Sequence, residues 1–309
     1  MNARLTFIHA LSPLHAGTGQ GTGVIDLPIA REKATGLPFL PGSSLKGTLR
    51  ARCNTNAQEC RLLFGPEAID TQTENNHASS VQFSDQRLLL LPVRSLAGTF
   101  AWVTSPYVLR RLARDIEDTQ LTPPKQPVPS IQDVESCVVA SEASKIKVDT
   151  SVYLEDLELK KIQMSGGKPE ETWASWIAQH VFPSDTGWQT ILTERFCIVH
   201  DDVFTFLLDT ATEITARIKL KSDSKTVEDG GLWYEEALPT ETILSGIALA
   251  TPTKAAETAG MTSTRVFAIL SNLTNTTLQF GGKATVGRGL CRVLLAEEVQ
   301  KGASHYANV

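Results

Sequence analysis

The sequence is poor in cysteine and aromatic residues and has no long apolar run, and these shortages exclude several classes of protein. The five cysteines are scattered, with no Cys-x-x-Cys pair, which excludes a disulfide framework or a thiolate zinc site and fits a reducing cytoplasm. No apolar run reaches the length of a membrane span, and the first residues lack the pattern of a signal peptide. We therefore expect a cytoplasmic protein with no membrane partner.

The chain also lacks an excess of positive charge. Its formal net charge of −5 argues against a protein that coats nucleic acid indiscriminately. Residues 31–61, however, hold six Lys or Arg against two Glu, and Lys283, Arg288 and Arg292 stand near the end with no acid among them. A locally basic groove on an acidic body can hold RNA, although ordinary solvated faces explain the charge alone equally well.

Several catalytic and nucleotide-binding motifs are absent. The chain has no phosphate loop, no dinucleotide fingerprint, no Gly-x-Ser-x-Gly elbow and no His-Glu-x-x-His. His200-Asp201-Asp202 lacks the partner histidine of a metal-dependent hydrolase, so we expect Asp201 or Asp202 to cap a helix instead.

The periodicity of apolar residues alternates irregularly between strand and helix, which predicts an α+β fold. We expect a helix capped by Ser43 or Ser44, a hairpin that pairs 214–220 with 231–237, a break at 165–169 and a frayed tail after residue 300. The remaining expected segments are strands at 3–11, 81–91, 99–103, 148–160, 196–199, 242–250 and 290–296, an extended piece at 24–29, a loop at 119–136, and helices at 105–117, 172–181, 201–211 and 262–273.

The most informative stretch is a glycine run followed by one acid and a basic helix. Gly17, Gly19, Gly21 and Gly23 alternate before Asp26, and the helix after them carries Ser43, Lys46 and Arg50. Glycines let a backbone lie close to a ligand, and cations in the first turns of a helix suit a phosphate. The simplest interpretation is a polyanion bound beside a lone acid, although a glycine run can also be a mere turn.

A second glycine run, at 281–289, mixes glycines with two cations. Successive backbone N–H groups together with Lys283 and Arg288 would hold an extended phosphate backbone, with Gly281, Gly282 and Gly287 allowing its approach. A basic hairpin turn is the alternative.

Three further residues are ambiguous from sequence alone. His15 can contact either the loop backbone or a ligand, and in isolation a structural histidine is the better interpretation. Glu235 and Glu236 lie at the base of the expected hairpin, where an acidic pair is often simply solvated.

Together, the motifs at 14–19, 24–29, 40–47, 232–239 and 281–289 resemble, in order, those of the RAMP superfamily of CRISPR effector proteins. Within it the chain looks like the repeating backbone subunits, the fourth Cmr subunits, of type III-B (Cmr) complexes. The Tyr-Glu-Glu-x-Leu-Pro element and the acid after the first glycine run favour this family over its relatives.

The resemblance implies a single RAMP domain over 1–309 with an RRM-like (ferredoxin-like) palm, large insertions and a protruding β-hairpin thumb. The palm segments would be about 1–54 and 240–300, the inserted central region about 55–211 and the thumb about 212–239. Implied partners are CRISPR RNA, complementary target RNA, further copies of the chain in a helical filament, and other Cmr subunits (a large Cas10-type subunit, a small subunit and end-capping RAMP subunits). Guide–target pairing would supply the sequence specificity, which agrees with the low aromatic content of 6%.

The resemblance also implies cleavage of the paired target RNA at regular intervals, by attack of a 2′-hydroxyl on the adjacent phosphate. Asp26 would be the ligand of a weakly bound divalent ion, Mg²⁺ or Mn²⁺, or the base for the hydroxyl. His15, Glu235 and Glu236 would support it. The residues expected to bind the guide RNA are Gly17, Gly19, Ser43, Lys46, Arg50, Gly281, Gly282, Lys283, Gly287 and Arg288.

Two other functions remain open at this point. The protein can be an architectural RNA-binding subunit without catalytic activity, in which Asp26 only caps backbone N–H groups. Alternatively, the glycine runs can hold a small phosphorylated metabolite in an unrelated enzyme, which would stay a small closed oligomer rather than form a filament with RNA.

Overall fold

The computed structural model describes residues 2–19, 24–54, 57–66, 77–162 and 169–297. Within those residues the protein is α+β, as expected, and its buried apolar side chains form one hydrophobic core. Gly21, Gly23, most of the expected break at 165–169 and the tail after residue 300 lie outside the described residues. None of the described helices is long and apolar enough to cross a membrane.

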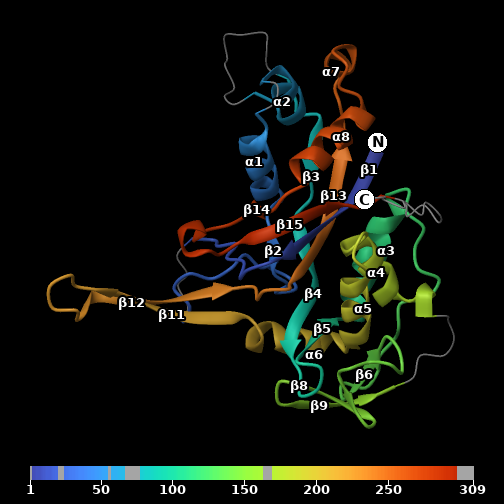
Figure 1. Ribbon diagram of the computed structural model, residues 1–309, viewed down its shortest axis with the longest axis vertical. Coiled ribbons are helices and arrows are strands. Elements are labelled where there is room, and N and C mark those ends of the chain that lie inside the picture. Colours follow the sequence, from blue (N-terminus) through green and yellow to red (C-terminus); the bar gives the residue numbers. More distant parts are fainter. Residues whose placement is uncertain (1, 20–23, 55–56, 67–76, 163–168, 298–309) are drawn as a thin grey trace, which may run out of the picture.

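One half of the main sheet is built around β1 (Asn2–Ala10), which is buried from Leu5 onward. β1 lies antiparallel between β13 (Ile243–Ala250) and β15 (Leu290–Leu295). β3 (Val81–Phe83) pairs with β13, and β14 (Leu278–Gln279) pairs with the outer edge of β15. Helices α1 (Gly42–Arg52) and α8 (Ser263–Leu273) pack on this half and on each other (Figure 1).

The central region continues the same sheet. β4 (Gln86–Arg94) pairs with β13 on one side and with β5 (Phe100–Thr104) on the other, so the region expected as an insertion shares its sheet with the flanking segments. The full strand order is β14-β15-β1-β13-β4-β5-β10-β6-β9-β8-β7, with β2 on β4 and β3 on β13. The other elements of this half are β2 (Phe39–Leu40), β6 (Ser136–Val139), β7 (Lys147–Val148), β8 (Ser151–Leu154), β9 (Leu157–Lys161), β10 (Phe196–Val199), α3 (Pro106–Glu117), α4 (Trp173–Val181), α5 (Thr186–Arg195) and α6 (Asp201–Thr210).

Two expected single strands are in fact broken. The segment 81–91 divides into β3 and β4 at Ser84–Asp85, and 148–160 divides into β7, β8 and β9, with Glu155 at φ +48° in the turn between β8 and β9. Apolar alternation continues across such short turns, so it hides them. The helices and turns absent from the sequence prediction are α2 (Ala57–Phe64), α5, α7 (Lys254–Thr258) and the short 3₁₀ turns η1 (Pro169–Glu171) and η2 (Ala284–Val286). The short strands β2, β6 and β14 are also absent from it.

Helix capping confirms some expected starts and corrects two. Ser105, Thr172 and Thr262 accept backbone hydrogen bonds at the starts of α3, α4 and α8. The predicted Asp cap of α6 is wrong, because the His200 ring accepts from the backbone N–H of Asp202 while Asp201 accepts from the backbone N–H of Tyr107.

The predicted serine cap of α1 is also wrong. The helix begins at Gly42, and the carboxylate of Asp85 accepts the Gly42 N–H at 2.9 Å, so a neighbouring turn supplies the cap. A Cβ at Gly42 would lie 2.4 Å from the carbonyl oxygen of Phe83, so only glycine fits this close approach.

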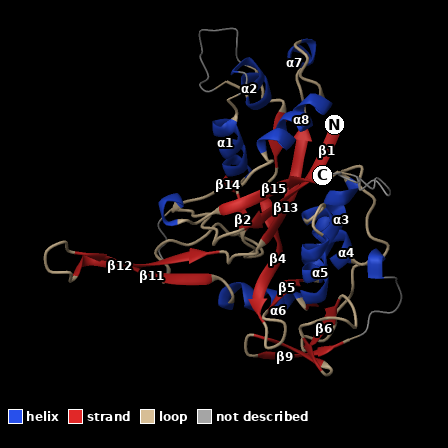
Figure 2. Ribbon diagram, in the orientation of Figure 1, coloured by secondary structure: helices blue, strands red, loops and turns tan. Residues whose placement is uncertain are grey.

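A two-stranded hairpin projects from the body, as Figures 1 and 2 show, and it confirms the predicted pairing. It consists of β11 (Glu213–Leu220) and β12 (Val227–Ala237). Directly opposed residues share a face, so Ile218 lies beside Leu232, and Arg217 lies beside Trp233 on the other face. The large apolar side chains that remain 41–55% exposed along the hairpin are Ile214, Ile218, Leu220, Val227, Leu232 and Tyr234.

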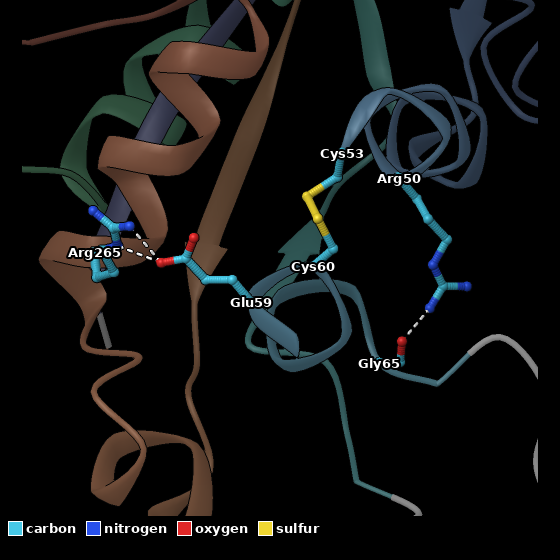
Figure 3. The surroundings of a disulfide bond; sticks show 6 residues. All are labelled: Arg50, Cys53, Glu59, Cys60, Gly65 and Arg265. Atoms are coloured by element: carbon cyan, nitrogen blue, oxygen red, sulfur yellow. Dashed lines mark hydrogen bonds and ion pairs between the residues drawn. A yellow bond between two sulfur atoms is a disulfide. The ribbon is translucent and has the colours of Figure 1, made fainter. Parts of the chain in front are cut away.

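One disulfide corrects the sequence-based exclusion of disulfides. Cys53 follows α1 and Cys60 lies in α2, and their sulfurs are bonded across a sequence separation of 7 (Figure 3). Their two Cα atoms lie 5.8 Å apart, a proximity that cysteine spacing alone does not reveal. Cys137, Cys197 and Cys291 are buried free thiols.

Candidate nucleic-acid interface

Asp26 lies against the base of the projecting hairpin. Its exposed carboxylate accepts the backbone N–H of Tyr234 at 2.8 Å. The next residue, Leu27, donates to the carbonyl of Tyr234 and accepts from the N–H of Glu236, at 3.1 and 3.0 Å. The extended piece at 24–29 therefore runs parallel to β12 at its base, and it brings the predicted catalytic acid to the hairpin.

Glu236 fixes this extended piece from the core side. Its side chain is 3% exposed, and its two oxygens accept from the N–H of Ile29 at 3.0 Å and from the guanidinium of Arg31 at 2.5 Å. An acid that was ambiguous in the sequence is therefore buried and paired rather than solvated.

Glu235 points to the opposite face of β12, because successive residues of a strand alternate. It is 2% exposed and contacts the ammonium of Lys283 at 2.7 Å, the indole N–H of Trp233 at 2.8 Å and the guanidinium of Arg217 at 3.4 Å. Burial raises the pKa of Glu235, but hydrogen bonds from Lys283 and Trp233 and the charges of Lys283 and Arg217 outweigh it, and the pKa falls to about 2. The acid pair thus joins two loops to β12: Glu236 holds the segment after the first glycine run, and Glu235 holds the second glycine run.

His15 lies between the two glycine runs and is 7% exposed. Its Nδ1 lies 2.7 Å from the backbone oxygen of Glu236, and its own backbone oxygen accepts from the N–H of Gly282 at 3.0 Å. A Cβ at Gly17 would lie 2.5 Å from the His15 ring, and one at Gly281 would lie 2.2 Å from its carbonyl. These contacts give His15, Gly17 and Gly281 a packing role at the base of the hairpin.

Other glycines of the two runs are open to solvent on the side where a Cβ would stand. Gly19 and Gly287 have φ angles of +98° and +79°, with nothing within 4 Å of that position. Their backbone geometry favours glycine because L side chains rarely adopt it, and it leaves both loops accessible to a ligand.

The two cations of the second run differ in exposure. Lys283 is 32% exposed and paired with Glu235, whereas Arg288 is 7% exposed and donates to the hydroxyl of Thr215 on β11 at 3.2 Å. Among the described residues, Nη1 of Arg288 is buried without a hydrogen-bond partner. Arg288 is thus not the open surface cation that the sequence pattern indicates.

The predicted cations of α1 are also held by protein groups. Lys46 donates to the hydroxyl of Ser79 at 2.7 Å, and burial, with the charge of Arg50, lowers its pKa. Arg50 donates to the carbonyls of Phe64, Gly65 and Pro66 at 2.6–3.1 Å, so it fixes the end of α2 (Figure 3). Ser43 is exposed in the first turn of the helix.

A resident metal site is not formed by the described residues, which contain no cluster of three or more His, Cys, Asp or Glu able to hold an ion. Asp26 offers one exposed carboxylate, which fits an ion that takes its other ligands from water and phosphate. Sequence reasoning missed Arg31 and Trp233. The alternation of 233–236 along a strand would have shown that Glu235 and Glu236 face opposite ways, although not which groups they meet.

Comparisons with known proteins show which family the chain belongs to. The sequence model of the RAMP superfamily matches residues 7–292. The Cmr endoribonuclease Cmr4 of Pyrococcus furiosus is 35% identical over 309 residues, covering 99% of each chain, and the CMR subunit Cmr4 of Saccharolobus solfataricus is 25% identical over 92% of this chain and 93% of its own. The crystal structure of oligomeric Cmr4 from Pyrococcus furiosus superposes with a TM-score of 0.73 at 28% identity, covering 96% of this chain and 98% of that one.

Proposed function

Because this chain belongs to the RAMP superfamily, we propose that it is a guide-RNA-binding backbone subunit of a type III-B CRISPR complex that cleaves paired target RNA. The similarity to a named Cmr endoribonuclease covers the whole chain, which supports the assignment of this activity. The observation that carries the proposal is the exposed carboxylate of Asp26, held at the base of a projecting hairpin. Its partners would be CRISPR RNA, target RNA, further copies of itself and the other Cmr subunits.

The palm of this subunit would be RRM-like. The strands β15, β1, β13 and β3 lie in that order, each antiparallel to its neighbour, and α1 and α8 connect them in the sequence. A β-α-β-β-α-β unit has this order and these connections. The palm would thus include β3 from the central region.

The guide-RNA surface would combine the accessible glycines with cations that can exchange a protein partner for phosphate. Gly19 and Gly287 leave space for a backbone. Lys46 donates to the Ser79 hydroxyl, and Lys283 pairs with Glu235 and lies over the ring of Trp233. Ser43 is exposed in the first turn of α1, the helix that also carries Lys46. The loops behind this surface would be shaped by Gly17, Gly281, Gly282 and Arg288. Arg50 would contribute indirectly, by fixing the end of α2.

The hairpin would displace one nucleotide of the guide–target duplex at each subunit. Its exposed aliphatic face suits insertion between bases, because apolar wedges unstack neighbouring bases at a cost of a few kcal/mol per step. Ile218 and Leu232, which are 55% and 53% exposed, oppose one another on this face.

A displaced nucleotide can adopt the in-line geometry that cleavage requires. Its 2′-oxygen attacks the adjacent phosphorus while the 5′-oxygen leaves and takes a proton from water, giving a 2′,3′-cyclic phosphate and a 5′-hydroxyl end. Of His15, Asp26, Glu235 and Glu236, only Asp26 is exposed, so it would orient the 2′-hydroxyl and receive its proton, or hold a divalent ion together with RNA phosphate. A bound Mg²⁺ or Mn²⁺ would supply charge stabilisation for the phosphate oxygens. The buried pair Glu235 and Glu236 would position the loops.

The test is cleavage of an end-labelled complementary RNA by the reconstituted complex with Mg²⁺, Mn²⁺ or EDTA. Wild type should give evenly spaced products with cyclic phosphate ends, and Asp26→Asn and Asp26→Ala should lose them while still binding the guide. An unchanged ladder in both variants would show that other residues catalyse cleavage. An unchanged rate in EDTA would show that cleavage needs no divalent metal.

A second candidate is a silent architectural subunit. The hydrogen bond from the Tyr234 N–H to Asp26 favours it, because it gives the acid a structural role. In that case wild type would bind guide RNA and form filaments but give no ladder.

A further inference from the structure

Arg31 connects the segment that carries Asp26 to both sides of the hairpin. Its guanidinium donates to the carboxylate of Glu236 at 2.5 Å, to the carbonyl of Leu208 at 3.1 Å and to the carbonyl of Gly36 at 3.1 Å. Leu208 lies in α6, which leads into β11, and Glu236 lies near the end of β12. One planar side chain therefore spans the place where the hairpin leaves the body and the place where it returns.

The same side chain acts on Asp26 through a continuous set of bonds. Glu236 accepts from Arg31 with one oxygen and from the N–H of Ile29 with the other. Ile29, Leu27 and Asp26 are then fixed in turn, since Leu27 bonds both Tyr234 and Glu236 and Asp26 accepts from Tyr234. The bonds that residues 26–31 make to the base of the hairpin thus set the direction of the Asp26 carboxylate.

Charge makes this arrangement depend on Arg31. The carboxylate of Glu236 is 3% exposed, and the guanidinium of Arg31 is the cation paired with it among the described residues. A buried carboxylate that loses its partner must take up a proton or move toward water. Protonation weakens the bond from the Ile29 N–H, because a neutral carboxyl is a poorer acceptor than a carboxylate, and movement toward water breaks it. Either change loosens the segment.

We propose that Arg31 is a positioning residue for RNA cleavage, which acts through Glu236 to fix Asp26 relative to the hairpin. The inference rests on the proposed function. Arg31 touches neither the RNA nor the reacting atoms in this role, so its loss should slow cleavage of bound target without weakening target binding. A displacement of about 1 Å at a reacting group can cost about 100-fold in rate.

The experiment is single-turnover cleavage by the assembled complex, with target affinity measured separately. Arg31→Met should cleave about 30- to 100-fold more slowly at unchanged affinity, and Arg31→Lys, which keeps the charge but not the fork, should recover about tenfold. Glu236→Gln combined with Arg31→Met should be no slower than the slower single variant, because both act on one path. A rate for Arg31→Met within threefold of wild type, or a loss confined to affinity, would overturn the proposal.

The matched control is Arg87→Met. Arg87 on β4 is paired with the buried Asp115 on α3, so this variant also loses a largely buried arginine–carboxylate pair. Within the described part of the chain, the side chains of this pair do not bond to the hairpin. Its cleavage rate should stay within twofold of wild type. An equal slowing in Arg87→Met would assign the effect to general destabilisation.

A second measurement does not depend on activity. Hydrogen exchange of the Ile29 and Tyr234 amides in the full chain should become at least tenfold faster in Arg31→Met and remain unchanged in Arg87→Met. If the wild-type complex does not cleave, the proposed function fails, but this readout still tests the positioning. Unchanged exchange in Arg31→Met would overturn it.

Discussion

The carboxylate of Asp26 accepts a hydrogen bond of 2.8 Å from the backbone N–H of Tyr234, which lies 208 positions later in the chain. The contact joins the acid after the first glycine run to the returning strand of the hairpin. The bond fixes the direction of the Asp26 carboxylate, which remains exposed. Asp26 therefore has a structural role and an available chemical role, and substitutions can separate the two.

Asp26→Asn and Asp26→Ala should differ in stability but not in cleavage. The amide oxygen of Asn can still accept from Tyr234, whereas Ala loses the bond at about 1 kcal/mol. Both variants should lose about 100-fold or more in cleavage rate, because neither can take up a proton. Urea unfolding and single-turnover cleavage measure the two effects. If only Asp26→Ala lost activity, the hydrogen bond and not the charge would matter.

Substitutions of Lys46 and Arg50 should have different effects on the salt dependence of RNA binding. Lys46→Met should reduce the slope of log K against log salt by about 0.7, the value for one phosphate contact on a single strand. Arg50→Met should leave the slope unchanged, because its guanidinium is held on the carbonyls of Phe64, Gly65 and Pro66, and should instead lower the unfolding free energy by about 1–3 kcal/mol. A changed slope in Arg50→Met would place Arg50 on the RNA.

The ion pair of Glu235 and Lys283 should make stability depend on acid pH. The pKa of Glu235 is about 2 in the folded chain and near 4.5 when unfolded, so its contribution is fully present above pH 4.5 and is lost as the pH falls toward 2. At about 1.4 kcal/mol per pKa unit the contribution is at most about 3 kcal/mol. Lys283→Met should reduce this loss between pH 5 and 2, as measured by chemical unfolding. An identical pH profile in the variant would show that Lys283 does not stabilise the carboxylate.

Reduction of the Cys53–Cys60 bond should destabilise the region that joins α1 and α2. For a loop of this length, chain entropy gives a loss of about 2 kcal/mol in unfolding free energy. Cys53→Ser with Cys60→Ser should show the same loss, and reductant should then have no further effect on that variant. Equal stability of the wild type with and without reductant would contradict the prediction.

The apolar face of the hairpin should determine where the target RNA is cut. Ile218→Asn with Leu232→Asn should reduce evenly spaced cleavage at least tenfold, because polar side chains insert poorly between bases. Guide binding should persist. Leu96→Asn changes a residue that is 74% exposed outside the hairpin and is the control. An intact ladder in the double variant would exclude the wedge.

Local patterns in the sequence predicted the elements that depend on near neighbours. The caps Ser105, Thr172 and Thr262 and the pairing of β11 with β12 are confirmed, because capping and alternation act within a few residues. The cap of α1 was missed because Asp85, more than 40 positions away, supplies it. The disulfide was missed because it requires knowledge of how two helices meet.

The sequence by itself determined the chemistry available: two glycine runs, one acid after the first, cations nearby and an acidic pair at the base of a hairpin. Only the tertiary structure decided which of these groups act together. It buried Glu235 against Lys283 and Glu236 against Arg31, committed Arg50 to the end of α2 and left Asp26 exposed on the hairpin. The reason is physical: a residue type fixes charge and hydrogen-bonding capacity, whereas burial and partners depend on contacts between segments far apart in the chain.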